Sequence, residues 1–372
     1  MFSSRKQLRS HQPDLIFILL SFLLVSFGLI MLFSASSSLA KLKFDDSCFF
    51  IKKQILYGLI PGLIGFFIAY FFYYRKFLKI SLLLLILGLI SLLLVFTPLG
   101  LTINGARRWL NLGGFVFQPS EIARLFFIIY LASWLEKEER RKSLTSFLSF
   151  LFICGIFIFL IIKQPSTSMS ILFLLTALIL YLVSGGKISY FFSSITLFAL
   201  IFLIVIISTP YRFTRIKAFL NPQIDPLGIN YQTNQNLTAL GSGGIFGKGF
   251  FHSSLKEKLI PEVITDSIFA VIGEEFGFLG SVIFITFFLL FVFRGFKIGL
   301  AAPDNFAKLL VIGLISSIAL EFFINLAAVS SIIPFTGLPL PFVSKGGTSL
   351  ATLLFSLGII ANISRYTRKN EK

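Results

Sequence analysis

The chain has 372 residues, of which 56% are hydrophobic and 13% charged, and it contains 48 phenylalanines, more than a soluble fold of this length could bury. Together with a mean hydropathy of +0.91, this composition excludes a soluble protein and predicts a polytopic integral membrane protein. The formal net charge is +17, but the sequence contains no soluble basic domain that could hold a polynucleotide. It therefore indicates contact with anionic membrane lipids and argues against a nucleic-acid partner.

Apolar runs long enough, or nearly so, to cross a hydrocarbon core of about 30 Å as a helix recur along the whole chain. They predict ten transmembrane helices, near residues 15–33, 55–72, 80–96, 122–135, 144–162, 169–183, 188–207, 268–293, 306–333 and 349–363. The fold class is therefore predicted to be all-α. We expect a single transmembrane domain, 15–364, between an N-terminal tail, 1–14, and a C-terminal tail, 365–372.

Lysines and arginines cluster in alternate connections, which predicts that both termini and both tails are cytoplasmic. Four lysines between the first two predicted helices are an exception, and we interpret them as tolerated on the outer side. Three polar segments then face outward, near 97–121, 209–267 and 334–348. The segment 209–267 lies between the seventh and eighth helices, is too long for a passive turn, and is expected to be ordered. It includes a basic amphipathic stretch that starts at Tyr211.

Ionisable groups gather at the predicted membrane edge within NGARRWLNLGGFVFQPSE, residues 104–121. Pro119 and Glu121 are typical of the first turn of a helix, and this structural role alone would account for the glutamate. Four further residues make a binding site the alternative interpretation: Arg107, Arg108, Trp109 and Arg124. Guanidinium groups suit a pyrophosphate, whereas a tryptophan could stack on a sugar or anchor the chain at the interface.

Thr265 and Asp266 come directly before the eighth predicted helix, where an N-cap is the simplest explanation. The helix that follows carries Glu274 and Glu275 inside the span, next to a face of small residues. Intramembrane carboxylates usually face a cavity, and small residues leave room either for a substrate or for close helix packing. An aspartate at the mouth of such a cavity could serve as a general base.

Two further loops contain residues that could contact a substrate. The glycine-rich segment 241–249 lacks the pattern of a nucleotide-binding P-loop, but its turn could direct backbone amides and Lys248 toward phosphate oxygens. A proline-then-glycine loop that includes Ser344 precedes the last helix and cannot be helical throughout. Glu321 and Asn325, within the ninth helix, are expected to hydrogen-bond to neighbouring helices. The two histidines, His11 and His252, lack the spacing of a zinc site, and Cys48 and Cys154 are not expected to pair.

Four segments together resemble the SEDS family, the FtsW and RodA proteins of bacterial cell-wall synthesis. They are GARRWLNLGGFVFQPSEIARL, YQTNQNLTALGSGGIFGKGF, LIPEVITDSIFAVIGEEFGFLG and TGLPLPFVSKGGTS, in the order and between the spans that the family shows. Ten spans with both ends inside are also the family pattern. The stretch YRFTRIKAFLNP is more similar to the division-type FtsW branch, with the elongation-type RodA branch as the alternative.

The resemblance implies a multi-pass peptidoglycan glycosyltransferase of the bacterial cytoplasmic membrane, which polymerises lipid II on the outer face during cell division or shape maintenance. Asp266 corresponds to the family's catalytic aspartate and would take the proton of the acceptor hydroxyl, with undecaprenyl pyrophosphate as the leaving group. Glu121 is the second expected catalytic residue, through support of the cavity or of a divalent cation, Mg²⁺ or Mn²⁺. The expected substrate-binding residues are Arg107, Arg108, Trp109, Arg124, Lys248 and Ser344.

The resemblance also implies partners: a class B penicillin-binding protein and other membrane proteins of the divisome or elongasome. The chain departs from the family pattern at Ile264, Ser267, Lys345, Ser166 and Ser168. Because of these departures, a noncatalytic scaffold for the penicillin-binding protein is one alternative function. A lipid II flippase is another, since a transporter also needs charged groups inside a helical bundle.

Overall fold

The computed structural model describes residues 10–103, 105–221, 228, 230–256 and 261–367. The outer parts of both predicted tails lie outside these residues, together with several of the basic side chains that predict the orientation. Both cysteines are free thiols.

Eight of the described helical segments are long and apolar enough to cross a membrane. They are α1 (Leu15–Phe44), the continuous run of α2 (Phe49–Gln54), the π-helical turn η1 (Ile55–Leu59) and α3 (Ile60–Phe71), then α4 (Arg75–Leu94), α7 (Leu144–Lys163), α9 (Ile188–Ile207), α12 (Ile268–Leu300), α13 (Asn305–Val329) and α14 (Gly347–Ser364). Two shorter helices, α5 (Pro119–Leu135) and α8 (Thr167–Val183), occupy the positions of the fourth and sixth predicted spans. The chain is a multi-pass helical membrane protein.

Two helices extend beyond the predicted spans. The first was expected to end near residue 33 but continues to Phe44, and the eighth continues past residue 293 to Leu300. The extension of α1 is buried at Ser34, Ala35 and Ala40, so the small residues there serve helix packing. The small polar residues at the start of this extension are accommodated because they pack against protein, whereas residues 41–44 at its end are exposed.

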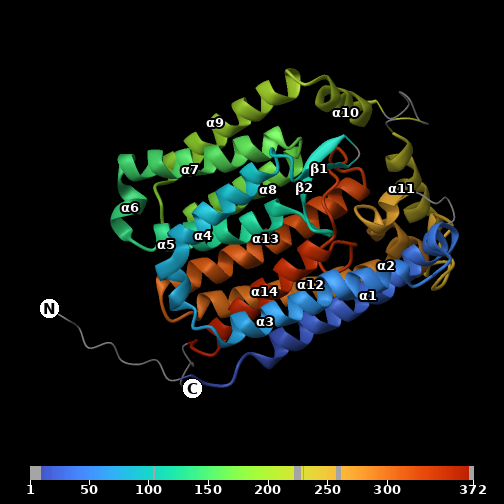
Figure 1. Cartoon of the computed structure of the whole chain (residues 1–372), viewed down its shortest axis with the longest axis horizontal. Coiled ribbons are helices and arrows are strands. Elements are labelled where there is room, and N and C mark those ends of the chain that lie inside the picture. Colours follow the sequence, from blue (N-terminus) through green and yellow to red (C-terminus); the bar gives the residue numbers. More distant parts are fainter. Residues whose placement is uncertain (1–9, 104, 222–227, 229, 257–260, 368–372) are drawn as a thin grey trace.

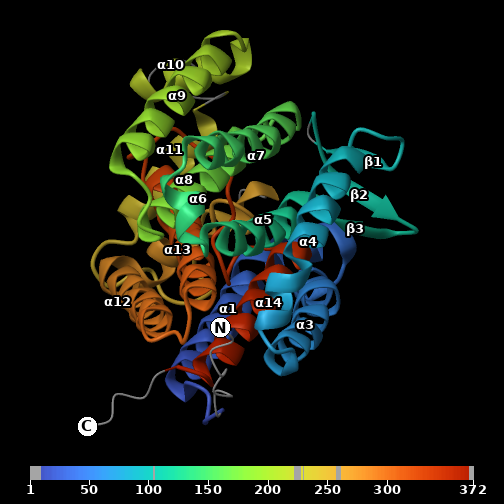
Figure 2. The ribbon, with the colours of Figure 1, turned by 90° about the vertical axis from the view of Figure 1, so that its left-hand side faces the viewer.

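The long helices run side by side, with both termini at one end of the bundle (Figure 1). Ion pairs join elements at this end: Arg75 to Asp304 and Arg294 to Asp14, each at 2.8 Å. The opposite end carries α2, α10 (Pro210–Leu220), α11 (Tyr231–Ser242) and three strands (Figures 1 and 2). Chain ends and polar segments are thus separated along the helix axes, as the alternation of basic connections predicts.

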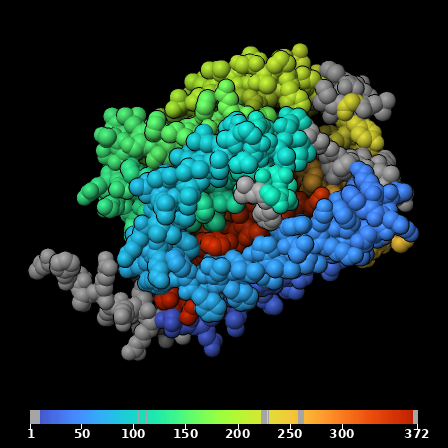
Figure 3. All heavy atoms as spheres, in the orientation of Figure 1, coloured from blue at the N-terminus to red at the C-terminus, as the bar shows by residue number. Residues whose placement is uncertain are grey.

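The centre of the bundle is formed by α13 and α14, whose apolar windows are 72% and 67% buried, whereas α9 at the periphery is only 17% buried. In the space-filling view, α14 lies between α3 and α4 (Figure 3). Small residues allow the close contact of α14 with α3: a Cβ on Gly358 would lie 2.4 Å from the Phe66 carbonyl oxygen. The peripheral helices expose large apolar side chains, as lipid contact requires.

The fold is mostly helical, as predicted, and the polar segment 97–121 adds a small sheet that was not predicted. The segment forms an antiparallel sheet in the order β1 (Gly100–Ile103), β2 (Ala106–Leu112), β3 (Phe115–Phe117). The turn between β1 and β2 contains Gly105 at φ +73°, a conformation that glycine adopts without strain. Since neighbouring side chains on a strand point to opposite faces, the sheet directs Arg107 and Arg108 to different surroundings.

The described parts of segment 209–267 contain three helical pieces: α10, α11 and the 3₁₀ helix η3 (Pro261–Ile264). The segment is ordered in these parts, as predicted, and the amphipathic stretch that starts at Tyr211 forms a helix. Residues 332–346 are non-helical up to the start of α14 at Gly347, which confirms the prediction for the proline-glycine loop.

Candidate functional site

Asp266 lies just before α12 and does not cap it. The helix begins at Ile268, and its N-cap residue, Ser267, makes no side-chain capping bond. The Oδ1 atom of Asp266 instead accepts a hydrogen bond of 2.6 Å from the Thr265 hydroxyl. Its main-chain carbonyl accepts one of 2.8 Å from the Asn325 amide of α13. The N-cap interpretation is therefore wrong, and the carboxylate is positioned by contacts that involve its own backbone and not the helix dipole alone.

The loop before α14 packs directly against this aspartate. The Ser344 hydroxyl donates to the Thr265 carbonyl, and the Lys345 amide donates to the Ile264 carbonyl at 2.9 Å. Gly337 has a φ of +67°, and a Cβ built on it would lie 3.3 Å from Oδ2 of Asp266. A side chain at this position would therefore both strain the backbone and crowd the carboxylate. Ser344 lies next to Asp266 in the fold, and its substrate-binding role stays a prediction.

Arg108 approaches the same site from the β-sheet. Its guanidinium donates to the Gln164 carbonyl, with Nε at 3.1 Å, and to the Pro165 carbonyl, both in the α7–α8 connection. Burial lowers the pKa of Arg108. Neighbouring groups also act on its charge: Tyr211 and Asp266 raise this pKa, and Arg215 lowers it. The structure therefore brings Arg108 and Asp266 into one electrostatic environment, although 158 positions of sequence separate them.

Arg107 and Trp109 face the other side of the strand. The Arg107 guanidinium donates to the Thr97 carbonyl at the end of α4. Trp109 pairs with Leu101 of β1 and is partly exposed. Of the three adjacent residues expected to bind substrate, the structure thus directs only Arg108 toward Asp266.

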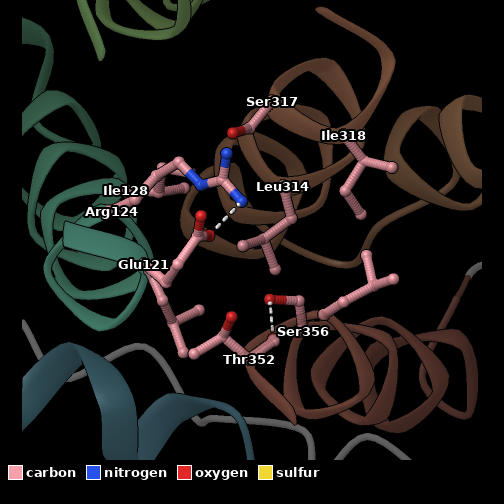
Figure 4. Close-up of a pocket in the computed structure, with 10 residues that line it drawn as sticks. Glu121, Arg124, Ile128, Leu314, Ser317, Ile318, Thr352 and Ser356 are labelled. Atoms are coloured by element: carbon pink, nitrogen blue, oxygen red, sulfur yellow. Dashed lines mark hydrogen bonds and ion pairs between the residues drawn. The ribbon is translucent and has the colours of Figure 1, made fainter. Parts of the chain in front are cut away.

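Glu121 and Arg124 belong to a separate, buried cluster between α5 and α13. Arg124 forms ion pairs with Glu121 at 2.8 Å and with Glu321 at 2.6 Å. Figure 4 shows Glu121 and Arg124 at a small cavity of about 20 Å³, beside Ser317, Thr352 and Ser356. That volume is enough for about one water molecule. The first-turn position of Glu121 in α5 is confirmed, and Glu321 hydrogen-bonds to a neighbouring helix as predicted.

The helix α13 links this cluster to the site at Asp266. Glu321 and Asn325 are four residues apart, so they lie on one face of the helix, one turn from each other. Asn325 donates to the carbonyls of Asp266 and Leu338, at 2.8 and 2.7 Å. Glu121 itself makes no recorded contact with Asp266 among the described residues.

Lys248 lies in a third cluster, where the glycine-rich loop holds a broken helix. The α12 helix is interrupted at Gly277, whose φ of +67° and ψ of −163° are non-helical. The amides of Lys248 and Gly249 donate to the carbonyls of Glu274 and Glu275, at 2.9 and 3.0 Å. On the other side of the break, the amides of Phe278 and Leu279 donate to the loop carbonyls of residues 244 and 245. These loop amides therefore complete the helix and do not face a phosphate.

Side chains complete this clasp, as we call residues 243–256 with α12 residues 274–279. Lys248 forms an ion pair of 2.6 Å with Glu274, which also accepts hydrogen bonds from Ser242, Ser253 and Ser254. Glu275 accepts from Ser34 of α1 at 2.7 Å. The small residues near the break serve close packing, since a Cβ on Gly243 would lie 2.1 Å from the Gly273 carbonyl oxygen. Lys248 is thus directed to the clasp and not to Asp266.

The residues that depart from the family pattern all have contacts. Ser168 donates to the Thr336 carbonyl at 2.7 Å, and Ser267 accepts from Gln232 at 3.1 Å. The Lys345 ammonium lies 4.4 Å from the centre of the Phe50 ring, while burial and the charge of Lys53 lower its pKa. Ile264 is buried, and the Ser166 amide donates to the Ile161 carbonyl.

No group of three or more His, Cys, Asp or Glu side chains could hold a metal ion within the part of the chain that the structure describes. Glu121, the residue expected to support a cation, is paired with Arg124.

A bundle of apolar helices, with an arginine and an aspartate brought together at the end opposite the termini, defines a polytopic membrane protein with a polar site at one membrane face. Residues 14–369 match the family FtsW/RodA/SpoVE, described as "Cell cycle protein". The chain belongs to this family, as the four motifs predict.

Relatives and solved structures agree with this membership. The chain is 40% identical over 360 residues to "Stage V sporulation protein E" of Bacillus subtilis (96% of this chain, 98% of the relative). It is 37% identical over 364 residues to "Probable peptidoglycan glycosyltransferase FtsW" of Trichlorobacter lovleyi (97% and 95%).

Two solved structures share the fold. One comes from "Structural coordination of polymerization and crosslinking by a peptidoglycan synthase complex", with a TM-score of 0.79, 26% identity and coverage of 96% of this chain and 99% of that chain. The other is the RodA protein of Thermus thermophilus, with a TM-score of 0.71, 25% identity and coverage of 96% and 98%. The chain is an inner-membrane glycosyltransferase of this family.

Proposed function

We propose that this protein polymerises lipid II into peptidoglycan strands at the outer face of the cytoplasmic membrane. The observation that carries the proposal is the convergence of Arg108, Ser344 and Asp266 at the bundle end opposite the termini. The names of relatives at 34–37% identity support the same activity, since they describe probable peptidoglycan glycosyltransferases.

In the proposed reaction, a hydroxyl oxygen of the acceptor sugar attacks the anomeric carbon of the lipid-linked donor. Asp266 takes the hydroxyl proton while the bond between the anomeric carbon and the pyrophosphate oxygen breaks. Undecaprenyl pyrophosphate leaves with the electron pair of that bond. Arg108 is assigned to the leaving group because its positive charge acts on the same site as Asp266 and could stabilise the negative charge that develops there.

The remaining predicted residues support this site from a distance. Glu121, Arg124 and Glu321 fix α5 against α13, and Asn325 of α13 holds the backbone of Asp266. Through these contacts the buried charges position the aspartate, and we assign them no direct contact with substrate. Lys248 is assigned to the clasp.

A class B penicillin-binding protein is the proposed partner, because the strands made here need crosslinking by a transpeptidase. The synthase complex that shares this fold combines polymerisation with crosslinking according to its title. The lipid II flippase is less well supported. The buried charges are paired with one another, and the cavity at Glu121 holds about 20 Å³, far below the size of a lipid headgroup.

The test is glycan-strand formation from purified lipid II by the full chain with its cognate penicillin-binding protein. Wild type should make polymer, and Asp266→Asn should reduce the rate by at least the roughly 10²-fold to 10⁴-fold contribution of a general base. The variant should retain the wild-type unfolding midpoint and partner binding. A folded wild-type complex that makes no polymer contradicts the proposal and favours the noncatalytic scaffold.

A further inference from the structure

Three consecutive residues of the loop before α14 each contact a different part of the molecule. The Phe335 carbonyl accepts from Arg215 of α10 at 3.3 Å, and the Thr336 carbonyl accepts from Ser168 at 2.7 Å. Gly337, next in line, faces the carboxylate of Asp266. The residue that binds Arg215, Phe335, is therefore only two positions before Gly337, which faces the aspartate.

Arg108 is fixed on the opposite side of the same wall. It binds the carbonyls of Gln164 and Pro165, and Ser168 of the same connection tethers that connection to Thr336. The charges of Arg215 and Asp266 both act on Arg108. Two arginines from different elements, β2 and α10, thus lie near the loop that faces Asp266.

Both guanidinium groups are positioned by neutral partners. Arg108 ends on two main-chain carbonyls, whereas Arg215 ends on one carbonyl and on the Tyr211 ring, 4.8 Å from its centre. Among the described residues neither arginine forms an ion pair with a carboxylate, unlike Arg124 and Lys248. Carbonyl contacts fix the two guanidinium groups without neutralising them, so their positive charge stays available to an anionic ligand.

We propose that Arg215 is a second pyrophosphate-binding residue, which together with Arg108 holds the lipid-linked pyrophosphate of the donor beside Asp266. The inference rests on the proposed function and adds α10 to the site. Each guanidinium offers paired donors that match phosphate oxygens. As the bond to the sugar breaks, the pyrophosphate gains negative charge, so the two arginines bind the departing group more tightly than the intact donor.

The same helix offers a matched control in Arg212. Its guanidinium donates to the Ile162 carbonyl near the end of α7 at 3.1 Å and to the hydroxyl of Thr209, between α9 and α10, at 3.2 Å. Arg212 and Arg215 thus carry the same charge on one helix and both bind a carbonyl, but only Arg215 contacts the loop that faces Asp266. Arg212→Gln removes the same charge from α10 without touching that loop.

The experiment measures undecaprenyl pyrophosphate binding to the full chain in nanodiscs, with undecaprenyl monophosphate as a second probe. We expect Arg215→Gln to weaken pyrophosphate binding by about tenfold to a hundredfold, the effect of one lost charged hydrogen-bonding group. The affinity for the monophosphate should fall less, because a monophosphate offers fewer oxygens to the two arginines. Arg215→Lys, which keeps the charge but loses the paired donors, should lie in between, and Arg212→Gln should bind like wild type.

Kinetics of strand formation provide an independent readout. Arg215→Gln should lower kcat as well as raise KM, because the interaction of Arg215 with the pyrophosphate strengthens as negative charge develops. Equal pyrophosphate binding by Arg215→Gln and Arg212→Gln overturns the inference, even if wild type polymerises lipid II. Binding that weakens as expected in a chain that makes no polymer supports the pyrophosphate site and contradicts only the proposed function. Unfolding midpoints of both variants show whether a loss comes from misfolding.

Discussion

The site at Asp266 and the charge clusters inside the bundle use the same residue types in opposite ways. Arg124, inside the bundle, is shared by two glutamates, and the buried Glu274 is paired with Lys248 of the glycine-rich loop, so each of these buried charges meets its opposite. At the site, Arg108 and Arg215 end on carbonyls. The difference teaches that burial in a membrane requires pairing, whereas a site for an anion keeps its positive charge uncompensated.

The strongest test of the interior pairing is Arg124→Met. It leaves Glu121 and Glu321 buried without their common partner, and breaking a buried pair costs about 3–5 kcal/mol. We expect the free energy of unfolding in mixed detergent micelles to fall by this amount. The control is the triple variant that also carries Glu121→Gln and Glu321→Gln, which should recover much of the loss. Unchanged stability of Arg124→Met would contradict the structural role of the cluster.

The contrast is sharpest between Arg108→Gln and Lys248→Gln, which each remove one positive charge. Loss of a group that stabilises developing negative charge costs about 10²-fold in rate, so Arg108→Gln should lower kcat by that factor with an unchanged unfolding midpoint. Lys248→Gln should do the reverse: a lower unfolding midpoint, with near wild-type activity per folded molecule. The measurements are the polymerisation rates and unfolding curves of both variants. Equal rate losses in the two variants would contradict the assignment of Arg108 to the site and of Lys248 to the clasp.

The clasp is tested at the break itself. Gly277→Ala places a side chain at φ +67° and ψ −163°, and its Cβ would lie 2.3 Å from the Gly247 amide nitrogen. Such backbone strain costs about 1–3 kcal/mol, which should appear as a lower free energy of unfolding. Gly105→Ala, at an open turn with positive φ and no neighbour within 4 Å, separates strain from the clash. If Gly277→Ala lowers the free energy of unfolding no more than Gly105→Ala does, the loop does not fit tightly against the break.

The smallest expected effect is that of Ser168→Gly, at one of the positions where the chain departs from the family pattern. It removes the hydrogen bond to the Thr336 carbonyl, a net loss of about 1 kcal/mol, and loosens the loop that faces Asp266. We expect a rise in KM for lipid II of a few fold with kcat nearly unchanged. Ser166→Gly is the matched control, since the serine side chain at 166 has no recorded bond to this loop. A larger effect at 166 would remove the assigned role of Ser168.

Much of the helical framework and several site residues were predictable from the sequence. Apolar runs predicted the positions of the long helices, and motif resemblance selected Asp266, Arg108 and Ser344. The sheet in 97–121 was missed, although the pairs Asn-Gly and Gly-Gly at its turns are typical hairpin signals. Arg215, which we propose as a second pyrophosphate-binding residue, was not singled out from the sequence, because a basic side chain on an amphipathic helix has no pattern that distinguishes a ligand contact from a solvated face.

The sequence by itself determined that the chain crosses a membrane repeatedly and which family it joins, because hydropathy and contiguous motifs are local properties. Only the tertiary structure decided which charges are paired and which remain available. Arg108 and Arg124 are 16 residues apart, yet Arg108 ends on main-chain carbonyls and Arg124 is shared by two glutamates. The partners of a buried charge come from elements distant in sequence, and the cost of leaving such a charge unpaired selects them only when the helices pack.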